Sequence, residues 1–161
     1  ASTALVEELP NCGSALVVVS WFGNDLRCGS CDVQPKVEQS EIDAEAMPWT
    51  VSGTARADAQ VIVQQDERPI YGGTPTDISV VEAIKSLRLK GQGAVFYPFI
   101  LMEQLADNGL IDPWSGSDDQ AALPWRGRIT TSLAPEIEGT PDGTATAEAE
   151  VAAFMGTASH V

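Results

Sequence analysis

Two uninterrupted apolar stretches constrain this chain more than any other feature of its sequence. Residues 15–22 (ALVVVSWF) and residues 94–102 (AVFYPFILM) contain no charged side chain. Continuous apolar runs of this length, bounded by turn residues, are typical of strands that are buried on both faces, as in parallel sheets. The sequence therefore predicts two buried strands within one α/β core.

The segments between and after these strands predict helices. Apolar residues recur at helical spacing in residues 54–65 and again in residues 78–89, and residues 144–155 are rich in alanine. Residues 68–71 read as a short extended piece between the first two helices. The order strand, helix, short strand, helix, strand, helix is the βαβ pattern of a parallel sheet.

Long loops are expected after both strands, over residues 23–49 and 107–131. In (β/α) barrels the loops that follow the strands build the active face, and a complete barrel takes about 250 residues. We therefore expect residues 1–161 to be part of a TIM-barrel-like α/β domain with parallel strands, the remainder of which is missing from this chain. A small open sheet is the alternative.

The charge of the chain excludes two classes of partner. The formal net charge is -14, from 23 acidic and 9 basic side chains, and such a chain repels both phosphate backbones and anionic lipid. No stretch approaches the roughly 20 apolar residues of a membrane helix. We expect neither nucleic acid binding nor membrane insertion. The first residues also lack the basic start of a signal peptide, which indicates synthesis in a cytoplasm.

The three cysteines are Cys12, Cys28 and Cys31. Cys28 and Cys31 form a single CxxC, whereas a structural zinc site needs four ligands, and the sequence has one histidine, His160. We expect reduced or locally paired thiols and no cofactor. A metal held by Cys28 and Cys31 is the weaker alternative, and it would need ligands from a neighbouring chain.

Candidate binding residues fall at strand ends and in the second long loop. Aromatic rings stack on sugars and carboxylates transfer protons in sugar-processing barrels. Asp25 is the one acid with a strand-end position, and it is a weak catalytic candidate because such mechanisms need two placed acids. Pairing of Asp25 with Arg27, and a place for the aromatic rings in the core, are the alternatives. The carbohydrate-binding candidates are Trp21, Asp25, Tyr97, Trp125 and Arg126.

Several blocks of the chain together resemble a known family. In chain order they are LVVVSWFGNDLRCGSC, MPWTVSG, RPIYGGTPTDISVVEAIKSL, FYPFILM and LPWRGRIT. They are similar to the glycoside-hydrolase-like TIM-barrel domain of gene transfer agents and related siphophages, which belongs to the tail-tip baseplate hub, or host specificity ("megatron"), protein. The resemblance covers most of the chain, from about residue 11 to residue 157.

The resemblance implies that residues 1–161 are the N-terminal part of the TIM-barrel-like domain and a fragment of a much larger chain. It also implies a protein of the virion tail tip that is made in the bacterial cytoplasm. Its implied partners are other tail and baseplate proteins, copies of itself and a host surface glycan. In that family a later block carries a glutamate in a Gly-Ser-Glu context, and this sequence ends before any such block. We therefore expect a structural role in hub assembly and host contact, with no glycosidase turnover from this segment alone. Part of a glycoside hydrolase that cleaves cell-wall or capsular glycan is the alternative.

Overall fold

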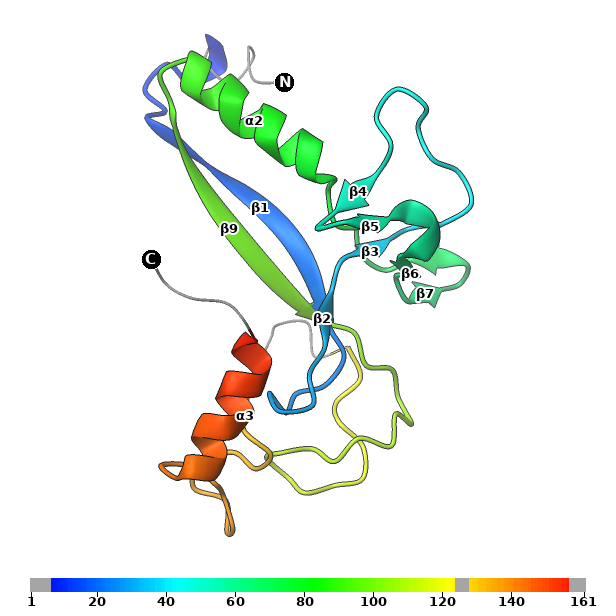
Figure 1. Ribbon diagram of the computed structural model, residues 1–161, viewed down its shortest axis with the longest axis vertical. Coiled ribbons are helices and arrows are strands. Elements are labelled where there is room, and N and C mark those ends of the chain that lie inside the picture. Colours follow the sequence, from blue (N-terminus) through cyan, green and yellow to red (C-terminus); the bar gives the residue numbers. More distant parts are fainter. Residues whose placement is uncertain (1–6, 124–127, 157–161) are drawn as a thin grey trace. The chain divides into compact units, whose positions relative to one another are not determined.

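The structure is a computed structural model that describes residues 7–123 and 128–156 (Figure 1). The chain divides into two compact units. Unit 1 comprises residues 1–21 and 35–99, and unit 2 comprises residues 22–34 and 100–161. The two longest strands, β1 (Ser14–Gly23) and β9 (Gly93–Met102), each contribute residues to both units.

The main sheet has three strands in the order β2-β1-β9, where β2 is Val33–Gln34. The N–H of Gly93 donates to the carbonyl of Gly13 at 2.8 Å, and the N–H of Glu103 donates to that of Gly23 at 3.1 Å. These two bonds have the same sequence separation, so β1 and β9 run in the same direction (Figure 1). Strand β2 is antiparallel to β1.

The expected barrel is not found in the described part of the chain. Apart from β1 and β9, the strands are only two residues long, and three of the four registered pairs are antiparallel, β3 with β6 being the exception. A (β/α) barrel needs long parallel neighbours on both sides of each strand, whereas β1 has the short antiparallel β2 on its outer side. The protein is instead a small mixed α/β fold. The short strands are β3 (Lys36–Val37), β4 (Thr50–Val51), β5 (Thr54–Ala55), β6 (Gln60–Val61), β7 (Gln64–Gln65) and β8 (Arg68–Pro69).

Two of the three predicted helices are confirmed. Helix α2 spans Asp77–Leu89 and helix α3 spans Ala145–Met155. The backbone of Thr76 caps the start of α2 in an extended conformation, and Leu87 is its one buried residue. The amphipathic pattern therefore located α2 correctly.

The helix predicted for residues 54–65 is wrong. That segment contains β5, a 3₁₀ turn at Arg56–Asp58, β6 and β7. Ser52 and Gly53 have positive φ values of 47° and 85°, as a two-residue hairpin loop requires, and they join β4 to β5. The β-branched run at residues 61–63 further favours extended backbone, because such side chains lose rotamer freedom in a helix.

The prediction that β1 and β9 are buried on both faces is also wrong for the first half of each strand. A residue that donates to the carbonyl of residue i in a parallel ladder lies opposite residue i+1, so Gly93 lies opposite Ser14. The same register places Val95 opposite Leu16 and Tyr97 opposite Val18, all on one face of the ribbon. We call Leu16, Val18, Val95 and Tyr97 the open face, because they are 56%, 48%, 50% and 45% exposed.

Each unit has buried apolar residues of its own. In unit 1, Val37, Trp49, Val51 and Ala59 form a cluster against which Trp21 packs. In unit 2 the buried apolar residues include the last residues of the long strands, Phe22, Leu101 and Met102, together with Leu26 and Ala134. The apolar runs thus contribute to two small cores rather than to one.

Candidate functional site

The open face of unit 1 is an apolar surface without charge. No charged residue occurs anywhere in β1 or β9, although the chain as a whole is strongly acidic. At one end of the open face the rings of Tyr97 and Phe99 lie 5.9 Å apart, tilted by 34°. Exposed apolar patches on otherwise polar proteins are characteristic of interaction sites.

Unit 2 contains a partly buried ion pair directly after β1, in which the Arg27 side chain is 23% exposed. The Arg27 guanidinium binds both oxygens of Asp25, with Nε to Oδ1 at 3.0 Å and Nη2 to Oδ2 at 2.6 Å. Asp25 is only 4% exposed. Burial raises the pKa of Asp25, but hydrogen bonds from Arg27 and Gln120 outweigh it and hold the pKa below its ordinary value. Asp25 is therefore ionised and structurally engaged at neutral pH.

Gln120 completes this cluster from the second long loop. Its Nε2 donates to Asp25 Oδ1 at 2.8 Å, and its Oε1 accepts the N–H of Leu26 at 3.0 Å and the amide of Gln104 at 2.9 Å. Glu103, which follows β9, is also buried in this unit. Sequence reasoning missed Gln120, Gln104 and Glu103. Glu103 and Gln104 could have been found from the sequence, because they directly follow a predicted buried strand, and polar residues at that position commonly contribute to binding sites.

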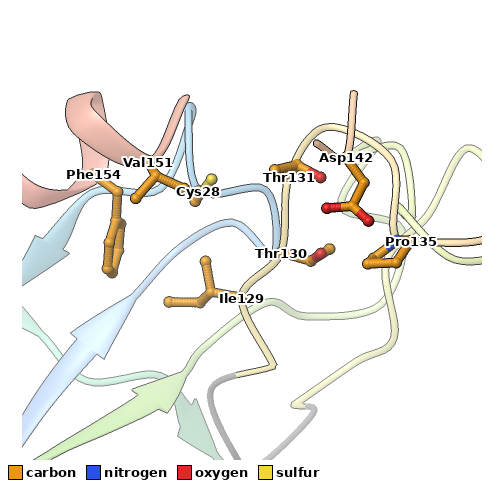
Figure 2. A pocket seen from close by; sticks show the side chains of 8 residues that line it. All are labelled: Cys28, Ile129, Thr130, Thr131, Pro135, Asp142, Val151 and Phe154. Atoms are coloured by element: carbon orange, nitrogen blue, oxygen red, sulfur yellow. The ribbon is translucent and has the colours of Figure 1, made fainter. Parts of the chain in front are cut away.

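A cavity of about 310 Å³ lies beside Cys28, within unit 2 (Figure 2). Apolar side chains of α3 and of the preceding loop form one part of its wall, and Thr130, Thr131 and Asp142 contribute oxygen atoms. A larger cavity of about 530 Å³ at the start of α3 shares Thr131, Asp142 and Val151 with it. Neither cavity is lined by Asp25, so its carboxylate has no access to them. The lining of the first cavity is Cys28, Ile129, Thr130, Thr131, Pro135, Asp142, Val151 and Phe154.

The cysteines of the CxxC lie in a turn after β1, and both are free thiols. The N–H of Cys31 bonds the carbonyl of Cys28 at 3.4 Å. Burial raises the pKa of both thiols, and the negative charge of Glu150 raises that of Cys28 further. Within residues 7–123 and 128–156, no three His, Cys, Asp or Glu side chains gather as metal ligands.

The structure does not bring the predicted sugar-binding residues into one described cleft. Trp21 and Tyr97 point to opposite faces of the β1–β9 ribbon, so they cannot flank one sugar. Asp25 belongs to unit 2, whereas Trp21 and Tyr97 belong to unit 1. Trp125 and Arg126 lie outside the described residues.

A tryptophan that sequence reasoning did not single out organises unit 1. Trp49 is 5% exposed, and its indole N–H donates to the carbonyl of Thr74 at 2.7 Å. The Arg56 guanidinium lies 5.8 Å from the centre of its ring and binds Asp43 at 3.1 Å. These contacts fix the 43–56 segment on the unit 1 core, and they leave Trp49 buried rather than available to a ligand.

No protein-family model matches the sequence, and no curated protein matches it. No helix in the described residues has the length and apolar character needed to cross a bilayer.

Proposed function

We propose that this chain is a structural component of a phage-type tail tip or baseplate, where it contributes to hub assembly and to contact with the host surface. The open face carries the proposal, because Leu16, Val18, Val95 and Tyr97 form an uncharged apolar patch on a chain of net charge -14. The order of the sequence blocks that resemble gene transfer agent hubs supports this setting. The proposed partners are other tail proteins, copies of the chain and a host glycan.

The test is incorporation into tail particles. A variant that carries both Leu16→Asp and Val95→Asp places two charges on the open face, and we expect it to be lost from purified particles. The matched control is Leu89→Asp, a change in helix α2 of the same unit, outside the β1–β9 ribbon, at a position that is 88% exposed. Gold-labelled antibody should mark the tail tip for the unchanged protein and for the control. The proposal would be refuted if particles lack the unchanged protein. It would also be refuted if they retain the double variant as well as they retain the Leu89→Asp control.

A second candidate function is part of a glycoside hydrolase that cleaves cell-wall or capsular glycan. Asp25 and Glu103 are buried carboxylates that follow the ends of neighbouring strands in unit 2. Two carboxylates are the usual machinery of such enzymes. With its pKa lowered, Asp25 suits the role of base or nucleophile rather than that of acid. However, Arg27 and Gln120 already bind its oxygens.

Incubation of the full-length protein with peptidoglycan and capsular polysaccharide separates the two functions. Release of reducing ends that is abolished by both Asp25→Asn and Glu103→Gln would make the hydrolase primary. Asp43→Asn is the control, because Asp43 lies in unit 1 and is more exposed. No release from any form would support the structural role.

A further inference from the structure

The two edges of the β1–β9 ribbon differ in their capacity to accept another strand. Gly93 and Glu103 direct their N–H groups toward β1, so the odd-numbered residues of β9 face β1 and the even-numbered ones face the free edge. Pro98 is even-numbered and has no N–H. A proline at this position interrupts the ladder that a strand added to β9 would need. The free edge of β9 is therefore closed in its middle.

The outer edge of β1 is open over a short stretch. The even-numbered residues of β1 direct their backbone groups outward, since the odd-numbered ones pair with β9. Ser20 already accepts a hydrogen bond from Thr74 at 2.8 Å, and Phe22 pairs with Gln34 of β2. Within the part of the chain that the structure describes, Leu16 and Val18 have no strand beside them on this side.

The same two residues also supply the apolar side chains nearest to that edge. Leu16 and Val18 are both about half exposed, and they lie on the open face with Val95 and Tyr97. A strand that pairs with Leu16 and Val18 would therefore gain backbone hydrogen bonds and cover apolar side chains in a single step. The combination of unpaired backbone groups and apolar side chains distinguishes the β1 edge from a surface that offers hydrophobic contact alone.

From these observations we infer that the β1 edge at Leu16 and Val18 binds an extended, cationic segment of another protein by strand addition. The segment needs apolar side chains at alternate positions, because those on one side of the added strand extend the open face. Positive charge on the segment favours its approach, because the whole chain carries a net charge of -14, and the ribbon itself has no charged residue that would repel lysine or arginine. The same net charge disfavours a second copy as the occupant, since two copies repel each other. This inference rests on the proposed docking role and specifies its partner.

The test uses the full chain and two synthetic peptides of equal length and composition. One alternates lysine and valine, and the other carries the same residues in pairs, which keeps the charge and removes the alternation. We expect the alternating peptide to bind at least about tenfold more tightly, because each 1.4 kcal/mol of lost pairing is a factor of ten. Binding should weaken as salt is added. Equal binding of the two peptides would overturn the inference and leave only charge attraction.

Amide hydrogen exchange locates the added strand without any mutation. The N–H groups of Leu16 and Val18 should gain protection when the alternating peptide binds, whereas those of Val17 and Val19, which already face β9, should change little. Protection confined to the β9 edge would refute the inference. Protection at Leu16 and Val18 that appears without peptide and rises with protein concentration would also refute it, and would identify a second copy as the occupant.

A pair of proline variants provides a second measurement. Val18→Pro removes an outward N–H of β1 and should weaken peptide binding about tenfold. Ala94→Pro removes an outward N–H from the other edge and should leave binding within about twofold. Equal losses would refute the β1 edge as the site. If the peptide tests fail but the antibody marks the tail tip of the particles, this inference is refuted and the proposed function is not.

Discussion

At the scale of single residues, Asp25 shows how a carboxylate after a strand can be structural. Sequence reasoning placed it correctly after β1 and kept open the alternative that it pairs with Arg27. The structure adds Gln120, which approaches from the second long loop. A contact that joins residues 95 positions apart leaves no local pattern in the sequence, so Gln120 could not have been predicted.

Asp25→Asn should lower the free energy of unfolding by about 2 kcal/mol, because it weakens the charge-assisted hydrogen bonds between Asp25 and the partly exposed Arg27. Urea unfolding at neutral pH measures the change. Asp58→Asn is the control, since Asp58 is exposed, and it should cost much less. Similar losses for the two variants would contradict the role given to the Asp25–Arg27 pair.

The pH dependence of stability has a definite sign. The folded-state pKa of Asp25 is lowered, so its contribution is present above the unfolded-state pKa of about 3.9 and is lost as the pH falls through the folded value. The difference in unfolding free energy between the unchanged protein and Asp25→Asn should therefore be constant near neutrality and shrink below about pH 4. A difference that grows on acidification would be inconsistent with an ionised Asp25.

The CxxC thiols should react slowly in the folded chain. Burial raises the pKa of Cys28 and of Cys31, and alkylating reagents attack the thiolate. At neutral pH we expect both to be alkylated more slowly than after unfolding in urea, as measured by peptide mass spectrometry over time. Equal rates in the folded and unfolded chain would contradict the burial of these sulfurs.

At the scale of elements, the sequence predicted those whose pattern is long and regular. Strands β1 and β9 and helices α2 and α3 each span ten residues or more. Strand β8 falls within the short extended piece expected at residues 68–71. The other short strands were missed because two residues are too few to show a period, and because tight turns rather than apolar spacing determine them. Barrel closure was wrongly expected because apolar residues on both faces of a strand were equated with burial on both faces.

Helix α2 offers a matched test of its packing. Leu87 is 7% exposed and Leu89 is 88% exposed, although they have the same chemistry and lie two residues apart. Leu87→Ala should lower the free energy of unfolding by at least about 2 kcal/mol, because it removes buried methyl groups and leaves a cavity. Leu89→Ala should change it by less than about 0.5 kcal/mol. Chemical denaturation of both variants checks the difference, and equal losses would contradict the assigned face.

At the scale of the whole molecule, net charge and the open face act in opposite directions. The charge of -14 keeps copies apart, whereas exposed Leu16, Val18, Val95 and Tyr97 favour association. The balance depends on pH, because carboxylates become protonated as the pH falls.

Association should therefore rise as the pH approaches the isoelectric point of about 4.2, where the repulsion disappears. Light scattering across a pH series measures it. The double variant Leu16→Ser with Val95→Ser leaves the charge unchanged and should associate less at that pH. Leu9→Ser, at a position 55% exposed outside the ribbon, should not differ from the unchanged chain. Equal scattering from the unchanged chain, the double variant and Leu9→Ser would show that the chains associate through a surface other than the open face.

Pro98 limits the number of strands that can add to the β1–β9 ribbon. A building block with two reactive ends propagates a chain, whereas a block with one reactive end terminates it. Because Pro98 interrupts the β9 edge and Leu16 and Val18 are about half exposed beside the β1 edge, the ribbon offers one edge for strand addition within the described residues. For an assembly that uses this ribbon, we expect each molecule to add one strand at β1 and the sheet to end at β9, so growth through the ribbon stops and does not continue into a fibre.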